Sequence, residues 1–163
     1  MKIKLLLLAF TCFLSFTSCS DDDSLPNNTL AGDNGFEFEK TAYFTDLVFI
    51  DEDNNILLSN QNISTRSSPE GHYVMFSTQN GNLNELTYTV GQNLENCNAL
   101  VSGRLQDGVL QGDDVLGQEN TEEGFMRIVN FNNFDQTIDI IFEFTRKDGK
   151  LVSGNYTGSF QRL

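Results

Sequence analysis

Two strands joined by a tight turn are predicted by residues 137–160, TIDIIFEFTRKDGKLVSGNYTGSF. Apolar side chains occupy every second position from Ile138 to Phe144, with Asp139 and Glu143 on the other face, and the period of two resumes from Val152 to Phe160. A period of two is that of a β-strand with one buried face. The segment therefore predicts an antiparallel hairpin.

The loop length of this hairpin follows from matching its apolar faces. A two-residue turn would place Phe144 opposite the polar Ser153, so we reject it. A three-residue loop at 147–149, with Gly149 in the left-handed conformation, places Phe144 opposite Val152 and matches every later apolar position with its partner. We predict the second register.

The rest of the chain also has the pattern of strands, and no segment has the 3.6-residue period of a helix. Segment 43–50 is apolar on both faces, as expected for a strand covered on both sides. We predict one all-β domain over residues 36–163, an antiparallel β-sandwich of about 8–10 strands. A lipocalin-like β-barrel is the alternative. The further strands are expected at 36–38, 43–50, 56–58, 72–78, 86–90, 97–105, 109–111 and 125–131.

The amino-terminal segment has the pattern of a secretory signal. Basic residues Lys2 and Lys4 precede an apolar run, 5–16, that is too short to span a membrane, and small residues then lead to Cys19. With Cys19 at the cleavage point, the segment resembles a bacterial lipoprotein signal peptide. The resemblance implies that residues 1–18 are removed and that Cys19 carries the lipid, including palmitate, as the first residue of the mature chain.

The acidic residues after Cys19 resemble the surface-export signal of Bacteroidota lipoproteins. That signal would consist of Ser20, Asp21, Asp22 and Asp23. The resemblance implies a protein anchored in the outer membrane and facing the cell exterior. The strand pattern G-x-Y-x-G-x-F at 154–160 resembles the last strand of small surface lipoproteins of the same group, which implies an all-β domain and no particular active site.

Residues 19–35 combine the lipidated cysteine with a polar segment that has few apolar side chains, and we expect a disordered acidic tether there. Within it, Asp23-Ser24-Leu25 resembles the O-glycosylation sequon of secreted Bacteroidota proteins. Ser24 is therefore a candidate sugar acceptor.

Charge and cysteine content exclude some classes of partner. The formal net charge is −13, and it becomes −15 when the signal and its two lysines are removed. Such a surface repels nucleic acid, so we expect no nucleic-acid partner.

Cys12 leaves with the signal and Cys19 is lipidated, which leaves Cys97 without a disulfide partner. Cys97 is interpreted as a buried apolar residue, with a reactive thiol as the alternative.

Candidate metal ligands are few. Asp51, Asp53 and Asn55 alternate like the first ligands of a calcium loop, but Ile56 and Asn62 replace the glycine and the final glutamate of the EF-hand pattern. A hairpin turn is the favoured interpretation. Acidic residues at 113–123 give the same choice between a calcium site and a solvated loop. We expect no cofactor.

Candidate catalytic groups are also isolated. Glu37 and Glu39 have the spacing of glycosidase carboxylates on one strand face, yet a half-exposed strand shows the same pattern. His72 has no nucleophile or orienting acid near it in the sequence and is interpreted as structural. The chain has no Trp, which argues against an aromatic sugar platform and leaves polar side chains as the means of contacting sugar hydroxyls.

These patterns predict a lipid-anchored, surface-displayed lipoprotein with a non-enzymatic role in binding or scaffolding an extracellular ligand or protein. The alternatives are a barrel-type carrier of a small apolar ligand and an enzyme whose site is not visible in the sequence.

Overall fold

The computed structural model of this chain describes residues 34–64, 66–79, 82–112, 115–116 and 121–163. These residues form twelve β-strands and no helix, so the all-β prediction is confirmed. The strands are β1 (Gly35–Phe38), β2 (Thr41–Phe44), β3 (Leu47–Ile50), β4 (Ile56–Ser59), β5 (Gly71–Thr78), β6 (Thr87–Thr89), β7 (Leu94–Gln106), β8 (Val109–Gln111), β9 (Val115–Leu116), β10 (Thr121–Asn132), β11 (Thr137–Arg146) and β12 (Leu151–Arg162).

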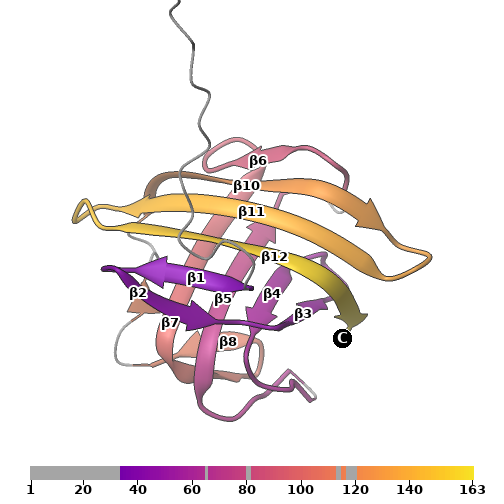
Figure 1. The fold of residues 1–163 in the computed structure, drawn as a ribbon, viewed down its shortest axis with the longest axis horizontal. Coiled ribbons are helices and arrows are strands. Elements are labelled where there is room, and N and C mark those ends of the chain that lie inside the picture. The colour runs from indigo at the N-terminus through magenta and orange to yellow at the C-terminus, as the bar shows by residue number, and fades with distance from the viewer. Residues whose placement is uncertain (1–33, 65, 80–81, 113–114, 117–120) are drawn as a thin grey trace, which may run out of the picture.

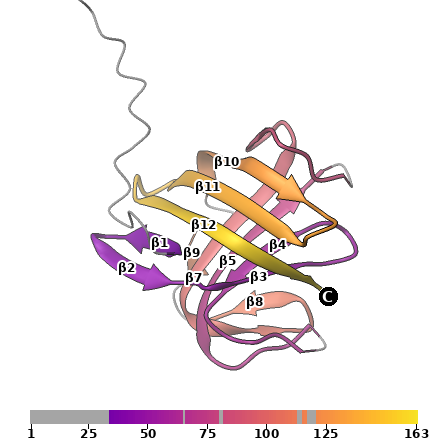
Figure 2. The same ribbon diagram turned by 45° about the vertical axis from the view of Figure 1, so that its right-hand side comes forward.

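The strands form a single curled and open sheet, a half-barrel with two facing layers. Its main path has the order β6-β10-β11-β12-β3-β4-β5-β7-β8, and β1, β2 and β9 pair outside this path. Strands β10, β11 and β12 form one layer and cross over the layer of β4, β5 and β7 (Figure 1, Figure 2). The shape combines features of the predicted sandwich and of the barrel alternative.

Strand β12 connects the two layers, and it does so by a pairing that the sequence did not predict. It runs antiparallel to β11 as far as Ser159, and its last residues, Phe160 to Arg162, then pair in parallel with Val48 to Ile50 of β3. The other named strand pairs are antiparallel, as predicted.

The hairpin of β11 and β12 has the predicted register. Phe144 lies opposite Val152, Phe142 opposite Gly154, and Ile140 opposite Tyr156. Gly149 has a φ of 78°, in the left-handed region that a three-residue hairpin loop requires. A Cβ at Gly154 would overlap the ring of Phe142, which explains the glycine at that position.

The main core lies between the two layers. Phe76 of β5 and Phe142 of β11 meet edge to face with their ring centroids 5.0 Å apart. Phe36 and Phe160 are also fully buried there. Burying one such side chain stabilises the fold by about 2–3 kcal/mol.

A second, smaller core covers the outer face of β3, β4 and β5. It contains Phe49, Leu57 and Tyr73, which loop residues 60–64 and 66–70 and the β7–β8 hairpin cover. The prediction that the 43–50 segment is covered on both sides is therefore confirmed for β3, where Val48 and Ile50 face the main core and Phe49 faces the second one.

Three details of the predicted strands are wrong. Segment 43–50 is divided between β2 and β3, because the strand is interrupted at Thr45 and Asp46, where the Thr45 N–H bonds to the carbonyl of Asn34. A turn at Glu39 and Lys40, both with positive φ, joins β1 to the short β2. Glu39 therefore lies in a turn and forms an ion pair with Lys150 at 2.6 Å instead of sharing a strand face with Glu37. Leu86, the first residue of the strand expected at 86–90, precedes the three-residue strand β6 and is exposed.

Candidate functional site

The residues predicted to carry the anchor lie outside the described residues. These are Cys19, the export residues Ser20 to Asp23, and Ser24. Among the acidic residues at 113–123, only 115–116 and 121–123 are described. Glu122 and Glu123 belong to strand β10 and not to a loop.

The candidate calcium residues form a hydrogen-bonded turn between β3 and β4. The Asp51 carboxylate accepts the backbone N–H groups of Asp53 at 3.0 Å and Asn55 at 2.9 Å, and it also accepts the Asn55 amide at 2.8 Å. Such bonds within an Asp-initiated turn are those of a structural turn. No group of three His, Cys, Asp or Glu side chains with metal-site geometry occurs in the described part of the chain.

The most distinctive irregularity in the sheet is a bulge in β7 opposite His72. Gly71 pairs with Gly103, whereas Tyr73 pairs with Leu100, so Val101 and Ser102 together face one residue of β5. A bulge of this kind bends the strand and changes the direction of its side chains. Here it separates the part of β7 that lies in the layer from the part that forms the β7–β8 hairpin.

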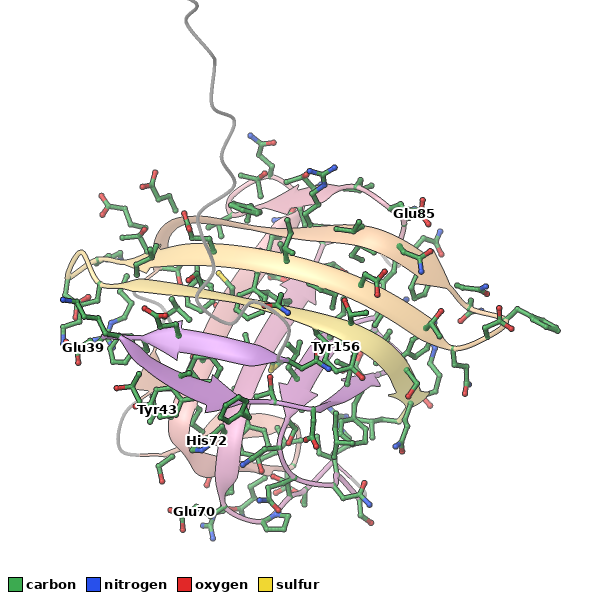
Figure 3. All side chains as sticks on the ribbon, in the orientation of Figure 1. Glu39, Tyr43, Glu70, His72, Glu85 and Tyr156 are labelled. Atoms are coloured by element: carbon green, nitrogen blue, oxygen red, sulfur yellow. The ribbon has the colours of Figure 1, made fainter. Side chains whose placement is uncertain are left out.

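The His72 side chain donates a hydrogen bond to a backbone carbonyl at the bulge. Its Nδ1 contacts the carbonyl oxygen of Val101, and because a carbonyl can only accept, Nδ1 carries the hydrogen. The imidazole also meets the ring of Tyr43 at 5.1 Å, and Tyr43 in turn stacks on Phe36. Figure 3 shows that Tyr43, His72 and Glu70 lie near one another at the same end of the domain. The structural role expected for His72 therefore fits its contacts.

Below the bulge lies an open polar groove of about 640 Å³. We call it the bulge groove. Arg104 and Gln111 lie directly opposite each other on β7 and β8, on the face away from the buried pair Leu105 and Leu110. Its lining consists of Ser68, Pro69, Glu70, Val101, Ser102, Gly103, Arg104, Gln111 and Gly112.

One wall of the bulge groove is held by a buried network. The Tyr73 hydroxyl donates to the carbonyl of Pro69 at 2.6 Å and lies 2.7 Å from the Ser68 hydroxyl, which accepts the N–H of Leu105 at 2.9 Å. Burial raises the pKa of Tyr73, so the phenol keeps its proton and remains a donor at neutral pH. These hydrogen bonds connect the wall to β5 and β7.

The groove lining also includes a carboxylate. The Ser102 hydroxyl donates to Glu70 Oε1 at 2.7 Å, and both side chains are exposed. This bond holds one carboxylate oxygen toward the bulge and leaves the second free to accept further hydrogen bonds.

Cys97 is buried in the main core, as predicted. Burial raises the pKa of its thiol to about 11, and its nearest polar partner is the Thr121 hydroxyl at 3.9 Å. A thiol with this pKa is protonated at neutral pH, which does not suit a nucleophile.

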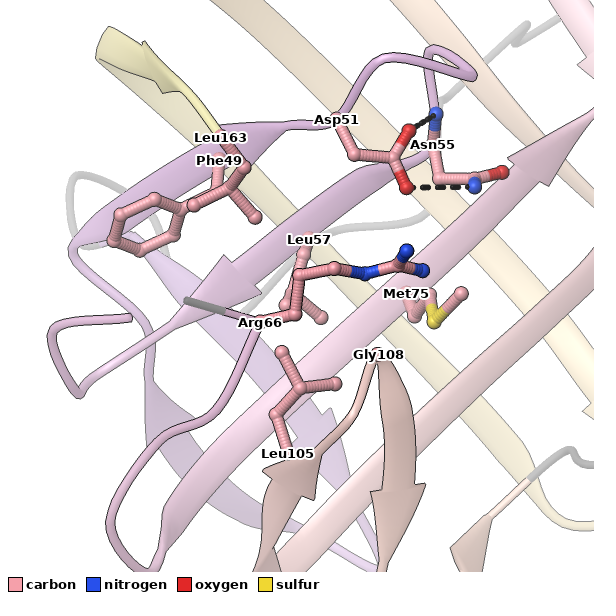
Figure 4. A pocket seen from close by; sticks show the side chains of 9 residues that line it. All are labelled: Phe49, Asp51, Asn55, Leu57, Arg66, Met75, Leu105, Gly108 and Leu163. Carbon is pink, nitrogen blue, oxygen red and sulfur yellow. Dashed lines mark hydrogen bonds between the residues drawn. The ribbon is translucent and has the colours of Figure 1, made fainter. Parts of the chain in front are cut away.

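Figure 4 shows a second, mainly apolar pocket between Phe49, Leu57 and Leu105, with Arg66 across its mouth. Its volume of about 30 Å³ is that of one water molecule. This pocket is too small for the apolar ligand of a carrier protein.

Comparisons with protein-family models, with curated proteins and with solved structures found no match to this chain. The described residues contain no helix that is long and apolar enough to cross a membrane.

Sequence reasoning identified His72 but missed the groove next to it. Four ordinary polar residues of the sequence come together there: Glu70 bonds to Ser102 at the bulge, and Arg104 pairs with Gln111 in the β7–β8 hairpin. The one local signal was the pair Gly103 and Gly112. A Cβ at either position would overlap backbone across the β7–β8 hairpin.

Proposed function

We propose that this chain is a lipid-anchored lipoprotein of the outer membrane that binds an extracellular ligand at the bulge groove. The anchor is the acylated Cys19, and the acidic residues after it direct the domain to the cell exterior. The role is non-enzymatic, and the ligand is a small molecule or a segment of a protein.

The observation that carries the binding role is the groove itself. It combines a preformed wall with exposed polar side chains, and within the described residues the side chains of Arg104 and Gln111 make no hydrogen bond or ion pair in the protein. Groups that converge on a hollow without internal partners are typical of a ligand site.

The position of the domain in the chain supports the anchor. Asn34 is clamped to β12, donating from Nδ2 to the carbonyl of Thr157 at 3.1 Å and accepting the N–H of Thr157 at 2.9 Å. The β domain therefore begins fifteen residues after Cys19. Such a segment, when flexible, has a reach of roughly 20 Å, enough to separate a domain from a membrane.

Metabolic labelling with an alkyne fatty acid tests the anchor. The expected result is label on the wild-type chain and none on Cys19→Ala, with Cys19→Ala found as precursor or released from membranes. Cys12→Ala is the matched control, since it changes the other cysteine of the signal region and should leave labelling unchanged. Normal labelling and membrane retention of Cys19→Ala would show that the proposal is wrong.

A further inference from the structure

The bulge groove presents hydrogen-bond donors of a kind that suits an anion. The Arg104 guanidinium and the Gln111 amide come from directly opposite positions of an antiparallel pair, where side chains lie about 5 Å apart. A guanidinium presents two parallel N–H groups that match the two oxygens of a carboxylate. In a chain with 23 acidic and 10 basic residues, this arginine has no carboxylate partner within the described residues.

The Glu70 part of the groove lining suits hydroxyl groups. The Glu70 carboxylate accepts one hydrogen bond, from Ser102, and an ionised carboxylate can accept several more. A second anion near Glu70 would be repelled, whereas a hydroxyl donor would be bound. A ligand that suits both groups therefore carries acceptor oxygens for Arg104 and hydroxyl donors for Glu70.

The size and lining of the groove limit the ligand further. A volume of about 640 Å³ holds a molecule of one or two sugar rings, and the lining contains no aromatic side chain to stack on a flat apolar face. Recognition therefore depends on polar contacts.

We propose that the bulge groove binds a small polyhydroxylated carboxylate, such as a sugar acid, with its carboxylate on Arg104 and Gln111 and its hydroxyl groups on Glu70. This inference rests on the proposed binding role of the groove and adds the chemical class of the ligand. His72 acts as a positioning residue, since it holds the carbonyl of the bulge and does not line the groove.

The inference is tested by titrating the full-length protein in detergent with D-glucuronate, D-glucose and acetate. Calorimetry and NMR monitor the binding of each compound. Glucuronate has both groups, glucose lacks the carboxylate, and acetate lacks the hydroxyls. We expect saturable binding of glucuronate at least tenfold tighter than of either control compound. Binding should weaken about tenfold or more in Arg104→Gln and in Glu70→Gln, because each loses a charge-assisted hydrogen bond.

Arg127→Gln is the matched control, because Arg127 is an exposed arginine on β10, in the other layer. It should bind glucuronate as the wild type does. Glucuronate binding that is absent, or that is unchanged in Arg104→Gln, overturns the inference. Equal binding of glucose and glucuronate, lost in Glu70→Gln, overturns the carboxylate assignment while retaining the groove as a binding site. The fatty-acid labelling of Cys19 is independent of all these results.

Discussion

His72 on β5 bonds through Nδ1 to the carbonyl oxygen of Val101 on β7, a residue 29 positions further along the chain. The bulge in β7 removes this carbonyl from the regular ladder, and the imidazole takes the place of a backbone donor. The same bulge turns Ser102 and Arg104 toward the groove. The contact between His72 and Val101 therefore supports the bulge that borders the groove.

Replacing His72 tests this contact. His72→Leu should lower the free energy of unfolding by about 1–2 kcal/mol, because a half-buried carbonyl loses its donor. His72→Gln, which keeps an N–H donor, should lose less. Urea denaturation followed by circular dichroism measures both values, and a Leu variant as stable as the wild type would contradict the role given to the ring.

Gly149 tests the hairpin register. Its φ of 78° is in the left-handed region, and a Cβ there meets no atom within 4 Å, so only backbone strain opposes a side chain. Gly149→Val should destabilise the domain by roughly 1–3 kcal/mol. Gly149→Asn should cost less, since Asn tolerates this conformation. Equal melting temperatures for the wild type and the Val variant would argue against the strained loop.

Phe134 and Phe142 are a matched pair for the core. Phe134 is 95% exposed on the loop between β10 and β11, whereas Phe142 is 2% exposed between the layers. Phe142→Ala should cost about 3–5 kcal/mol, and Phe134→Ala less than about 0.5 kcal/mol. Chemical denaturation of both variants provides the comparison. A large loss of stability in Phe134→Ala would mean that the Phe134 ring packs against the domain instead of facing solvent.

Cys97 predicts a pH dependence of stability. The pKa of the thiol rises from an ordinary value of 9.0 to about 11 in the fold, so between these values the folded chain binds more protons than the unfolded chain. Stability is then full below pH 9 and falls as the pH rises toward 11. The wild type should lose about 2 kcal/mol more than Cys97→Ala between pH 8 and pH 11. Burial also raises the pKa values of Tyr73 and Tyr156, and comparing the two proteins removes their contribution. If the free energies of unfolding of the wild type and Cys97→Ala changed with pH in parallel, the raised pKa of a buried thiol would be contradicted.

Local signals predicted the part of the fold that depends on local interactions. The β11–β12 register follows from an apolar pattern of period two and a glycine in a short loop, and both act within 24 residues. The turn at Glu39 and Lys40 was missed because neither residue is one of the glycine or asparagine residues that usually mark positive φ.

Features that depend on distant pairing were not predictable from the sequence. The parallel contact of Phe160 with Val48 joins strands from opposite ends of the domain and leaves no local pattern. The groove has the same origin, because Glu70 meets Ser102 only after β5 and β7 pair with a shifted register. Tertiary geometry therefore determined the site, while the sequence pattern predicted the fold class.

Display on the cell exterior is tested most directly by labelling intact cells with a membrane-impermeant amine-reactive biotin. Lys40 and Lys147 are exposed on the β domain and provide amines for the reagent. We predict that the wild-type protein is labelled on intact cells as strongly as after lysis, and that replacing Asp21, Asp22 and Asp23 by Ala restricts labelling to lysed cells. A wild-type protein that is labelled only after the outer membrane is opened would contradict surface display.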